Sequence, residues 1–160
     1  YHQIFKEDVL RGRSIIGMMT ACIYYACKEE GIPRTFQEIA EETDVKEKKI
    51  MKCYKILVRR LELKNPRINP ISFIPRYVAE LGLDHEIEKM TIKILKNYLK
   101  KNHVNGINPY GLCAGALYLA SKFRDQKRTQ KDIAEVVGIT EVTLRSRYRE
   151  LMDHIQLRII

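Results

Sequence analysis

The feature that most constrains the fold of this chain is an internal duplication. Displacing the sequence by 94 residues aligns residues 12–63 with residues 106–157 without a gap, and 14 of the 52 aligned positions are identical. Unrelated segments of this length would share about three identities by chance. The sequence therefore predicts two copies of one structural unit.

A proline-rich stretch separates the two copies. The segment KNPRINPISFIP, residues 64–75, contains three prolines, which interrupt a helix and favour a connection followed by a new helix start. We expect a first domain over residues 1–63, a linker over residues 64–72 and a second domain over residues 73–160.

Helical hydrophobic periodicity dominates both copies. Apolar residues recur at helical spacing over 84–102, and residues 110–123 are apolar nearly all round, as is typical of a central buried helix. Residues 14–28 match that helix in the first copy, a further helix is expected at about 74–82, and alternating strand patterns are absent. The fold is expected to be all-α, with five helices in the second copy.

The first copy is expected to be truncated. Tyr1 aligns with a position inside the second helix of the repeat, so the first copy would lack its first helix and show four. A missing helix would leave part of the first core exposed.

Two short helices end each copy in a helix-turn-helix pattern. Such a motif needs a small residue in its first helix, a residue that tolerates positive φ in the turn, and an aliphatic residue that anchors the second helix. The second copy offers Ala134, Gly138 and Leu144. The first copy offers Ala40, then Asp44, which tolerates the left-handed conformation less well than glycine, and Ile50.

The last helix of the second copy is expected to have a buried and an exposed stripe. Arg147 lies on the flank between them. The buried stripe comprises Glu141, Leu144, Tyr148 and Leu151, and the exposed stripe comprises Val142, Arg145, Ser146 and Arg149.

The exposed stripe has the chemistry of a DNA-reading helix. In a major groove, Arg145 could form two hydrogen bonds with a guanine edge and Val142 could contact a thymine methyl group. Arg147 and Arg149 are better placed for phosphates, which fix position without specifying sequence. The alternative is a solvated basic face without a ligand. The matching face of the first copy is basic but has no arginine at the position of Arg145.

Composition favours a polyanionic partner. The chain has a net charge of +9, shared as +4 in residues 1–72 and +5 in residues 73–160. No apolar run is long enough to span a bilayer, and no signal-peptide pattern begins the chain. The cysteines (Cys22, Cys27, Cys53 and Cys113) and the histidines have no zinc-site spacing, and reduced packing cysteines are favoured over metal or disulfide roles.

The tandem segments GRSIIGMMTACIYYACKEEGIPRTFQEIA and GINPYGLCAGALYLASKFRDQKRTQKDIAEVVGITEVTLRSRYREL resemble the core domain of archaeal general transcription factor B, in the transcription factor IIB family. The resemblance covers essentially the whole chain. It implies two tandem cyclin-like five-helix repeats that bind the TATA-binding protein on bent promoter DNA, set direction and help to recruit RNA polymerase. It also implies that the second repeat recognises an upstream element.

The resemblance places the base contacts of the family on Val142 and Arg145. Other residues around the second motif are expected to contact the DNA backbone: Thr140, Thr143, Ser146, Arg147, Arg149, Arg128 and Lys131. In the first repeat, contacts with DNA or the TATA-binding protein are expected at Lys48, Lys52, Lys55, Arg59 and Arg60.

No cofactor or metal is expected in this fragment, because the zinc ribbon of the family would lie in a missing N-terminal part. The resemblance further implies a monomer with no membrane association, located in the cytoplasm with the nucleoid if the source is archaeal.

Two other functional classes compete with this interpretation. A cyclin-type partner of a kinase is compatible with the helical repeat, but the paired helix-turn-helix patterns and the basic charge oppose it. An enzyme is disfavoured because no phosphate loop, acid–base pair or activated nucleophile is apparent. His103 and His154 are isolated and are interpreted as surface or helix-end residues.

Overall fold

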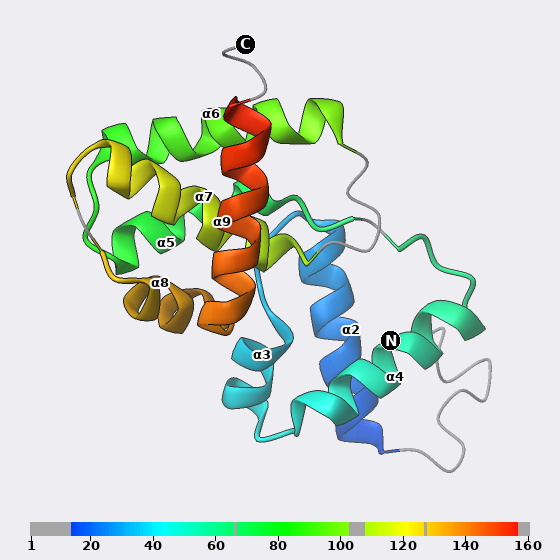
Figure 1. Cartoon of the computed structure of the whole chain (residues 1–160). Helices are drawn as coiled ribbons and strands as arrows, with labels where there is room; N and C mark the ends of the chain where they lie inside the picture. Colours follow the sequence, from blue (N-terminus) through cyan, green and yellow to red (C-terminus); the bar gives the residue numbers. More distant parts are fainter. Residues whose placement is uncertain (1–13, 66, 103–107, 127, 157–160) are drawn as a thin grey trace. The chain divides into compact units, whose positions relative to one another are not determined.

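The computed structural model describes residues 14–65, 67–102, 108–126 and 128–156. Within these ranges every regular element is helical, which confirms the all-α expectation (Figure 1). The chain divides into two compact units, Tyr1–Ile68 and Asn69–Ile160. The expectation that the chain begins inside a helix concerns residues 1–13, which lie outside the described part.

The order of helices is the same in both units where the repeat aligns. The first unit contains α2 (Ile15–Glu29), α3 (Phe36–Thr43) and α4 (Glu47–Arg60). The second contains the 3₁₀ helix η1 (Pro70–Phe73) and the α-helices α5 (Ile74–Glu80), α6 (His85–Lys101), α7 (Pro109–Phe123), α8 (Gln130–Val137) and α9 (Glu141–Gln156). Helices α2, α3 and α4 thus correspond to α7, α8 and α9.

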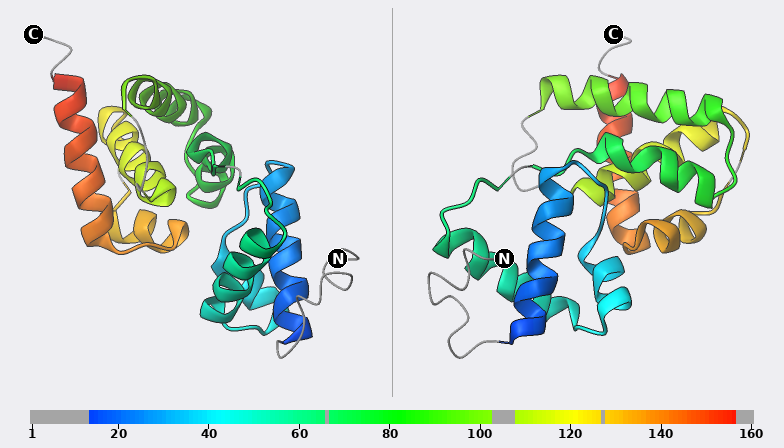
Figure 2. Two further views of the ribbon diagram at one scale, coloured as in Figure 1. Left: turned by 90° about the vertical axis from the view of Figure 1, so that its right-hand side faces the viewer. Right: turned by 180° about the vertical axis from the view of Figure 1, so that it is seen from behind.

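Helix α7 is the centre of the second unit, as its apolar composition predicts. It lies between α9 on one side and α5 and α6 on the other (Figure 2). Residues 111–117 and 119–121 are all buried. Its small residues allow close approach, because a Cβ atom added at Gly115 would lie 2.9 Å from the backbone nitrogen of Tyr148 on α9.

Helix α2 is only partly buried, in contrast to α7. Met18, Ala21 and Tyr24 form the core of the first unit with residues of α3 and α4. The opposite surface of α2 exposes four large apolar side chains: Ile15, Ile16, Met19 and Ile23. Two of the equivalent positions on α7, Cys113 and Leu117, are fully buried. Helix α2 therefore exposes apolar side chains at positions that are partly buried on α7.

Several repeat identities have a packing explanation. Tyr24 and Tyr54 meet edge to face with ring centroids 5.1 Å apart, and their counterparts Tyr118 and Tyr148 do so at the same distance. This geometry is favoured for aromatic pairs and joins the central helix to the last helix in each unit. The lysine four residues after the first tyrosine lies over the second ring in both copies (Lys28 and Lys122).

The end of the expected linker is structured. Asn69 accepts a hydrogen bond from the backbone nitrogen of Ile71 and caps η1, which begins with Pro70. Pro70 and Phe73 are buried in the second unit. Residues 69–72, expected in the linker, thus belong to the second unit. A side-chain cap and a proline at the first position favour the turn that they form.

Candidate nucleic-acid interface

The helix-turn-helix geometry predicted for the second copy is present in α8 and α9. Gly138 has φ = 74°, which ends α8 in the left-handed conformation, and the backbone nitrogen of Ile139 donates to the carbonyl of Ala134 at 2.9 Å. Ala134 and Leu144 are both buried, so α8 and α9 pack closely across this turn. The small residue, the turn and the anchor occupy the predicted positions.

The first copy forms the same turn with a less favourable residue. Asp44 adopts φ = 50° at the end of α3, and Ile50 is fully buried as the anchor of α4. The left-handed conformation costs free energy for any residue with a Cβ atom. The motif therefore exists twice, with more backbone strain in the first copy.

Side-chain caps define where these helices start. Thr35 with Glu38 and Thr129 with Asp132 form reciprocal capping boxes at α3 and α8. Hydrogen bonding to Thr129 lowers the pKa of Asp132. At α9, Thr140 Oγ1 accepts from the backbone nitrogen of Thr143 at 3.2 Å. The Thr140 hydroxyl thereby caps the start of α9, the helix that carries Val142 and Arg145.

The outward face of α9 carries the residues expected there. Val142 is 72% exposed, so its side chain is open to contact by a ligand. Arg145, Ser146 and Arg149 are also exposed on the helix. Leu144 and Leu151 are fully buried on the opposite stripe and Tyr148 is half-buried.

Glu141 differs from the expected buried stripe, because it is exposed. Its carboxylate lies 3.7 Å from the guanidinium of Arg145, one turn along the helix. An ionised carboxylate is costly to bury, and the first turn of a helix favours negative charge in solvent. Glu141 therefore belongs to the candidate interface.

Arg145 is held from two directions. Its Nε atom donates to Oε1 of Gln130 at 3.1 Å, and its Nη2 atom lies 3.7 Å from a carboxylate oxygen of Glu141. Gln130 is the first residue of α8, so this bond joins the two helices of the motif at the surface. Gln130 was not predicted from the sequence, because a glutamine at a helix start carries no signal until its neighbour in space is known.

Arg147 lies against α7, away from the exposed stripe. Its guanidinium pairs with Glu150, which also accepts a hydrogen bond from Tyr98 on α6. Burial, followed by the hydrogen bond to Glu150, raises the pKa of Tyr98 to about 12. The side-chain stem of Arg147 passes Gly111, where an added Cβ would lie 3.2 Å from Arg147 Cγ. The structure thus places Arg147 in a packing network, because the glycine leaves room for its stem.

Arg128 is also engaged within the second unit. Its Nε donates to the carbonyl of Leu81 at 2.9 Å and its terminal nitrogen donates to the carbonyl of Gly82 at 3.3 Å. These bonds satisfy carbonyl groups at the end of α5. Lys131 is exposed on α8.

The first unit presents a basic face on α4. The expected contact residues are all exposed there: Lys48, Lys52, Lys55, Arg59 and Arg60. Met51, which aligns with Arg145, is half-buried. The first copy therefore offers positive charge without a counterpart of the exposed arginine.

The described residues give no support for a metal centre. Within the ranges that the structure covers, no group of three or more His, Cys, Asp or Glu side chains could hold a metal ion. Cys113 is buried with its thiol 3.1 Å from the carbonyl of Pro70, and burial raises its pKa. His154 is half-buried near the end of α9, and His103 lies outside the described residues. None of the helices described could cross a membrane, since each is too short or too polar.

Known proteins resemble this chain along almost its whole length. The family described as "Transcription factor TFIIB repeat" matches residues 1–60 and 63–154, one repeat in each half of the chain. The matches to tandem repeats of this family agree with the duplication and with the expected repeat fold.

Curated archaeal relatives give the same result. Transcription initiation factor IIB of Methanocaldococcus jannaschii is 43% identical over 157 residues, which cover 98% of this chain and 23% of the relative. The factor of the same name from Archaeoglobus fulgidus is 41% identical over 160 residues, covering 100% of this chain and 49% of the relative. The chain thus spans half or less of the length of these relatives, which are named as initiation factors and not as enzymes. By its repeats, its helical fold and its similarity to these proteins, the chain belongs to the transcription factor TFIIB family.

Proposed function

We propose that this chain is the promoter-binding core of a general transcription initiation factor. It binds the complex of the TATA-binding protein with promoter DNA, recognises an upstream element and contributes to the recruitment of RNA polymerase. Family membership and the names of the relatives support the general role. The chain acts as a monomer, since its two repeats already provide two different binding faces.

The observation that carries the proposal is the exposed pair Val142 and Arg145 on the second helix of a well-formed helix-turn-helix. Arg145 is oriented by Gln130, which reduces the conformational freedom that it loses on binding. Its guanidinium suits the two acceptors of a guanine edge, and Val142 suits a thymine methyl group.

Polar and basic residues around this pair are proposed to contact the DNA backbone. Arg149, Ser146 and Lys131 are exposed near the motif, and the hydroxyl groups of Thr140 and Thr143 lie at the start of α9. Arg128 and Arg147 are assigned a supporting role instead, because both guanidinium groups are engaged within the unit. Phosphate contacts of this kind set orientation but not sequence preference.

The basic face of α4 is proposed to contact downstream DNA or the TATA-binding protein. Because each unit binds weakly alone, joining them raises the effective concentration of the second contact. Only the second unit has an exposed arginine at the reading position, so the pair of units is asymmetric. That asymmetry would set the direction in which the factor sits on a promoter.

The test is a gel-shift titration of the 160-residue chain on promoter DNA, with and without the TATA-binding protein. We expect tighter binding when the TATA-binding protein is present. Replacing Arg145 with alanine should cost about 1–3 kcal/mol on the matched upstream element and much less on an element changed at the contacted base pair.

Arg149→Ala is the matched control, because it removes an equal charge from the same exposed stripe. It should weaken binding to matched and mismatched elements alike. Equal losses on both elements for Arg145→Ala would refute the base contact. Unchanged affinity with and without the TATA-binding protein would refute the proposed complex.

A further inference from the structure

A row of lysines runs along the solvent face of α6. Lys89, Lys93, Lys96 and Lys100 are all exposed and follow each other at intervals of four, three and four residues. At about 100° of rotation per residue, these intervals keep the four side chains on one narrow stripe about three turns long. Lys89 pairs with Glu86, whereas no described acidic side chain forms an ion pair with the other three.

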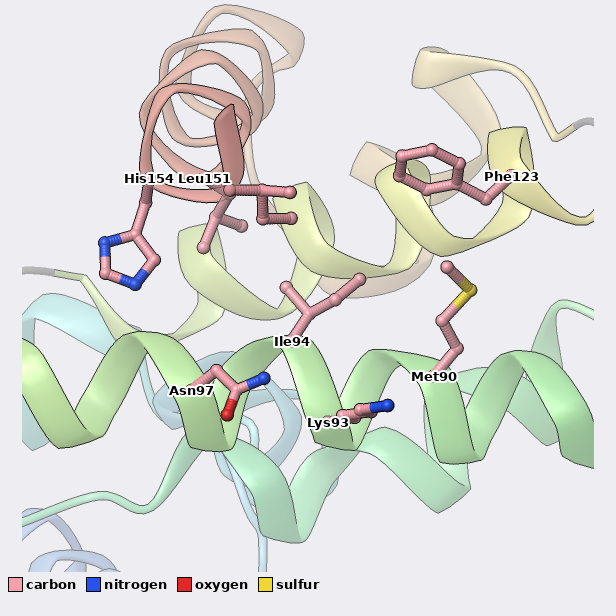
Figure 3. A pocket seen from close by; sticks show the side chains of 8 residues that line it. Met90, Lys93, Ile94, Asn97, Phe123, Leu151 and His154 are labelled. Carbon is pink, nitrogen blue, oxygen red and sulfur yellow. The ribbon is translucent and has the colours of Figure 1, made fainter. Parts of the chain in front are cut away.

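An apolar pocket opens beside this lysine row. It has a volume of about 260 Å³ and lies between α6, α7 and α9. Figure 3 shows Met90 and Ile94 directed from α6 toward the side of the pocket that carries Phe123 and Leu151. Phe123, at the end of α7, is 57% exposed, so part of its ring is accessible at the pocket. Lys93 belongs to both features, because it also lines the pocket.

This surface is separate from the DNA-reading face. Helix α6 contacts the C-terminal half of α9, where Tyr98 meets Glu150 and Asn102 approaches His154. Val142 and Arg145 lie in the N-terminal half of α9, next to α8 at the opposite end (Figure 1). A ligand on the lysine row would therefore leave the reading face open.

We propose that the lysine row and the adjoining pocket bind an acidic amphipathic segment of a partner protein. Carboxylates of that segment would lie along Lys93, Lys96 and Lys100, and a bulky apolar side chain would enter the pocket beside Phe123. The positive charge of the row favours an anionic ligand. Because the row is about three helical turns long, an extended ligand can contact more of it than a small molecule can. The pocket favours protein over DNA, because a phosphate backbone offers nothing to fill an apolar cavity, whereas an amphipathic helix does.

The probe for the test is a labelled synthetic peptide with leucines at helical spacing and glutamates at its other positions. Its binding to the 160-residue chain is measured by fluorescence anisotropy. The triple variant Lys93→Glu, Lys96→Glu, Lys100→Glu should bind the peptide at least about tenfold more weakly, since each attraction becomes a repulsion. The triple variant Lys48→Glu, Lys52→Glu, Lys55→Glu is the matched control, because it makes the same charge change over the same length of helix on α4. It should retain peptide affinity within about twofold.

A second part of the experiment tests whether the pocket contacts the peptide. Phe123→Ser should weaken the binding of the leucine peptide but not the binding of a peptide with alanines in place of the leucines. Circular dichroism checks that the variant remains helical. Equal binding of the leucine and alanine peptides to the unchanged chain would overturn the pocket contact. Equal loss of peptide binding in the α4 and α6 triple variants would show that the peptide is attracted by the overall positive charge and not by a site on α6. That result would overturn the proposal.

Promoter DNA distinguishes this proposal from the proposed function. The α6 triple variant should retain most of its affinity for promoter DNA with the TATA-binding protein. A loss of DNA affinity as large as the loss of peptide affinity would assign the lysine row to the DNA backbone and overturn the proposal. Arg145→Ala should leave peptide affinity unchanged, so failure of base recognition would not remove the peptide site.

Discussion

At the residue scale, Gly115 sets how closely α7 approaches α9. A Cβ atom added there would lie 2.9 Å from the nitrogen of Tyr148 and 3.0 Å from the carbonyl carbon of Arg147. Both are backbone atoms, so relief requires movement of α9 as a whole. The first copy has Ala21 at the aligned position, fully buried, so α2 and α4 accommodate a methyl group. The position of α9 thus depends on the absence of a Cβ atom at Gly115.

Gly115→Ala should destabilise the protein by about 1–3 kcal/mol, because overpacking exceeds the gain in helix propensity. Gly111→Ala is the control: its nearest neighbours are side-chain atoms of Arg147 and Thr143 at 3.2 Å, which can shift. Urea unfolding followed by circular dichroism measures both variants. Equal stability of the two would show that the close contact at Gly115 does not limit the packing of α9.

Arg145 and Arg147 show how differently two nearby arginines can be used. Arg145 contacts Gln130 and Glu141 at the surface. Arg147 instead pairs with Glu150 on its own helix, and its side-chain stem lies beside Gly111 of α7. The number of arginines on a helix therefore overstates the charge available to DNA. The direction of each side chain decides its role.

At the element scale, the two helix-turn-helix turns are a natural comparison of glycine with aspartate. Gly138 and Asp44 occupy the same left-handed position in the duplicated unit, at φ = 74° and 50°. Glycine adopts this conformation without steric cost, whereas aspartate retains part of the penalty of a Cβ atom. The turn of the second copy is therefore better suited to hold a precise angle between its helices.

Substitutions at the two turn residues should change the free energy of unfolding in opposite directions. Asp44→Gly is expected to stabilise the first unit by about 0.5–1 kcal/mol, after the entropy cost of glycine in the unfolded chain. Gly138→Ala should destabilise the second unit by about 1–2 kcal/mol. Thermal unfolding followed by circular dichroism tests both. Destabilisation by Asp44→Gly would mean that the aspartate side chain makes a contact worth more than the backbone strain.

At the scale of the whole molecule, two units with different exposed chemistry share one chain and a net charge of +9. The first presents a lysine-rich face on α4, and the second presents a mixed apolar and basic face on α9. Phosphate contacts release counterions, so binding that involves both faces should depend strongly on salt concentration. Base contacts contribute selectivity with less salt dependence.

The salt dependence of promoter binding should separate the two kinds of residue. Replacing Lys52 and Lys55 together with alanine should reduce the slope of log K against log salt by about 0.9 for each phosphate that these lysines neutralise. Val142→Ala should lower affinity for the matched element but leave the slope unchanged, because no charge is removed. Gel shifts over a salt series measure both slopes. An unchanged slope for the lysine variant would exclude those lysines from phosphate binding and favour a contact with the TATA-binding protein.

The amino-acid sequence by itself determined the duplication, the helical architecture and the positions of the two turns. These features depend on residues within a few positions of one another, or on a pattern repeated along the chain. Helical periodicity also placed Val142 and Arg145 on the exposed stripe, because a helix presents its faces in a regular order.

Only the tertiary structure decided which side chains are available at those faces. Gln130 reaches Arg145 from another helix, Glu150 is shared between Arg147 and Tyr98, and the pocket beside Lys93 needs walls from three helices. Glu141 was wrongly assigned to the buried stripe, because periodicity cannot show where the neighbouring helix stops covering α9. Side-chain direction and exposure depend on residues up to 52 positions away, so they are set by packing and not by local sequence.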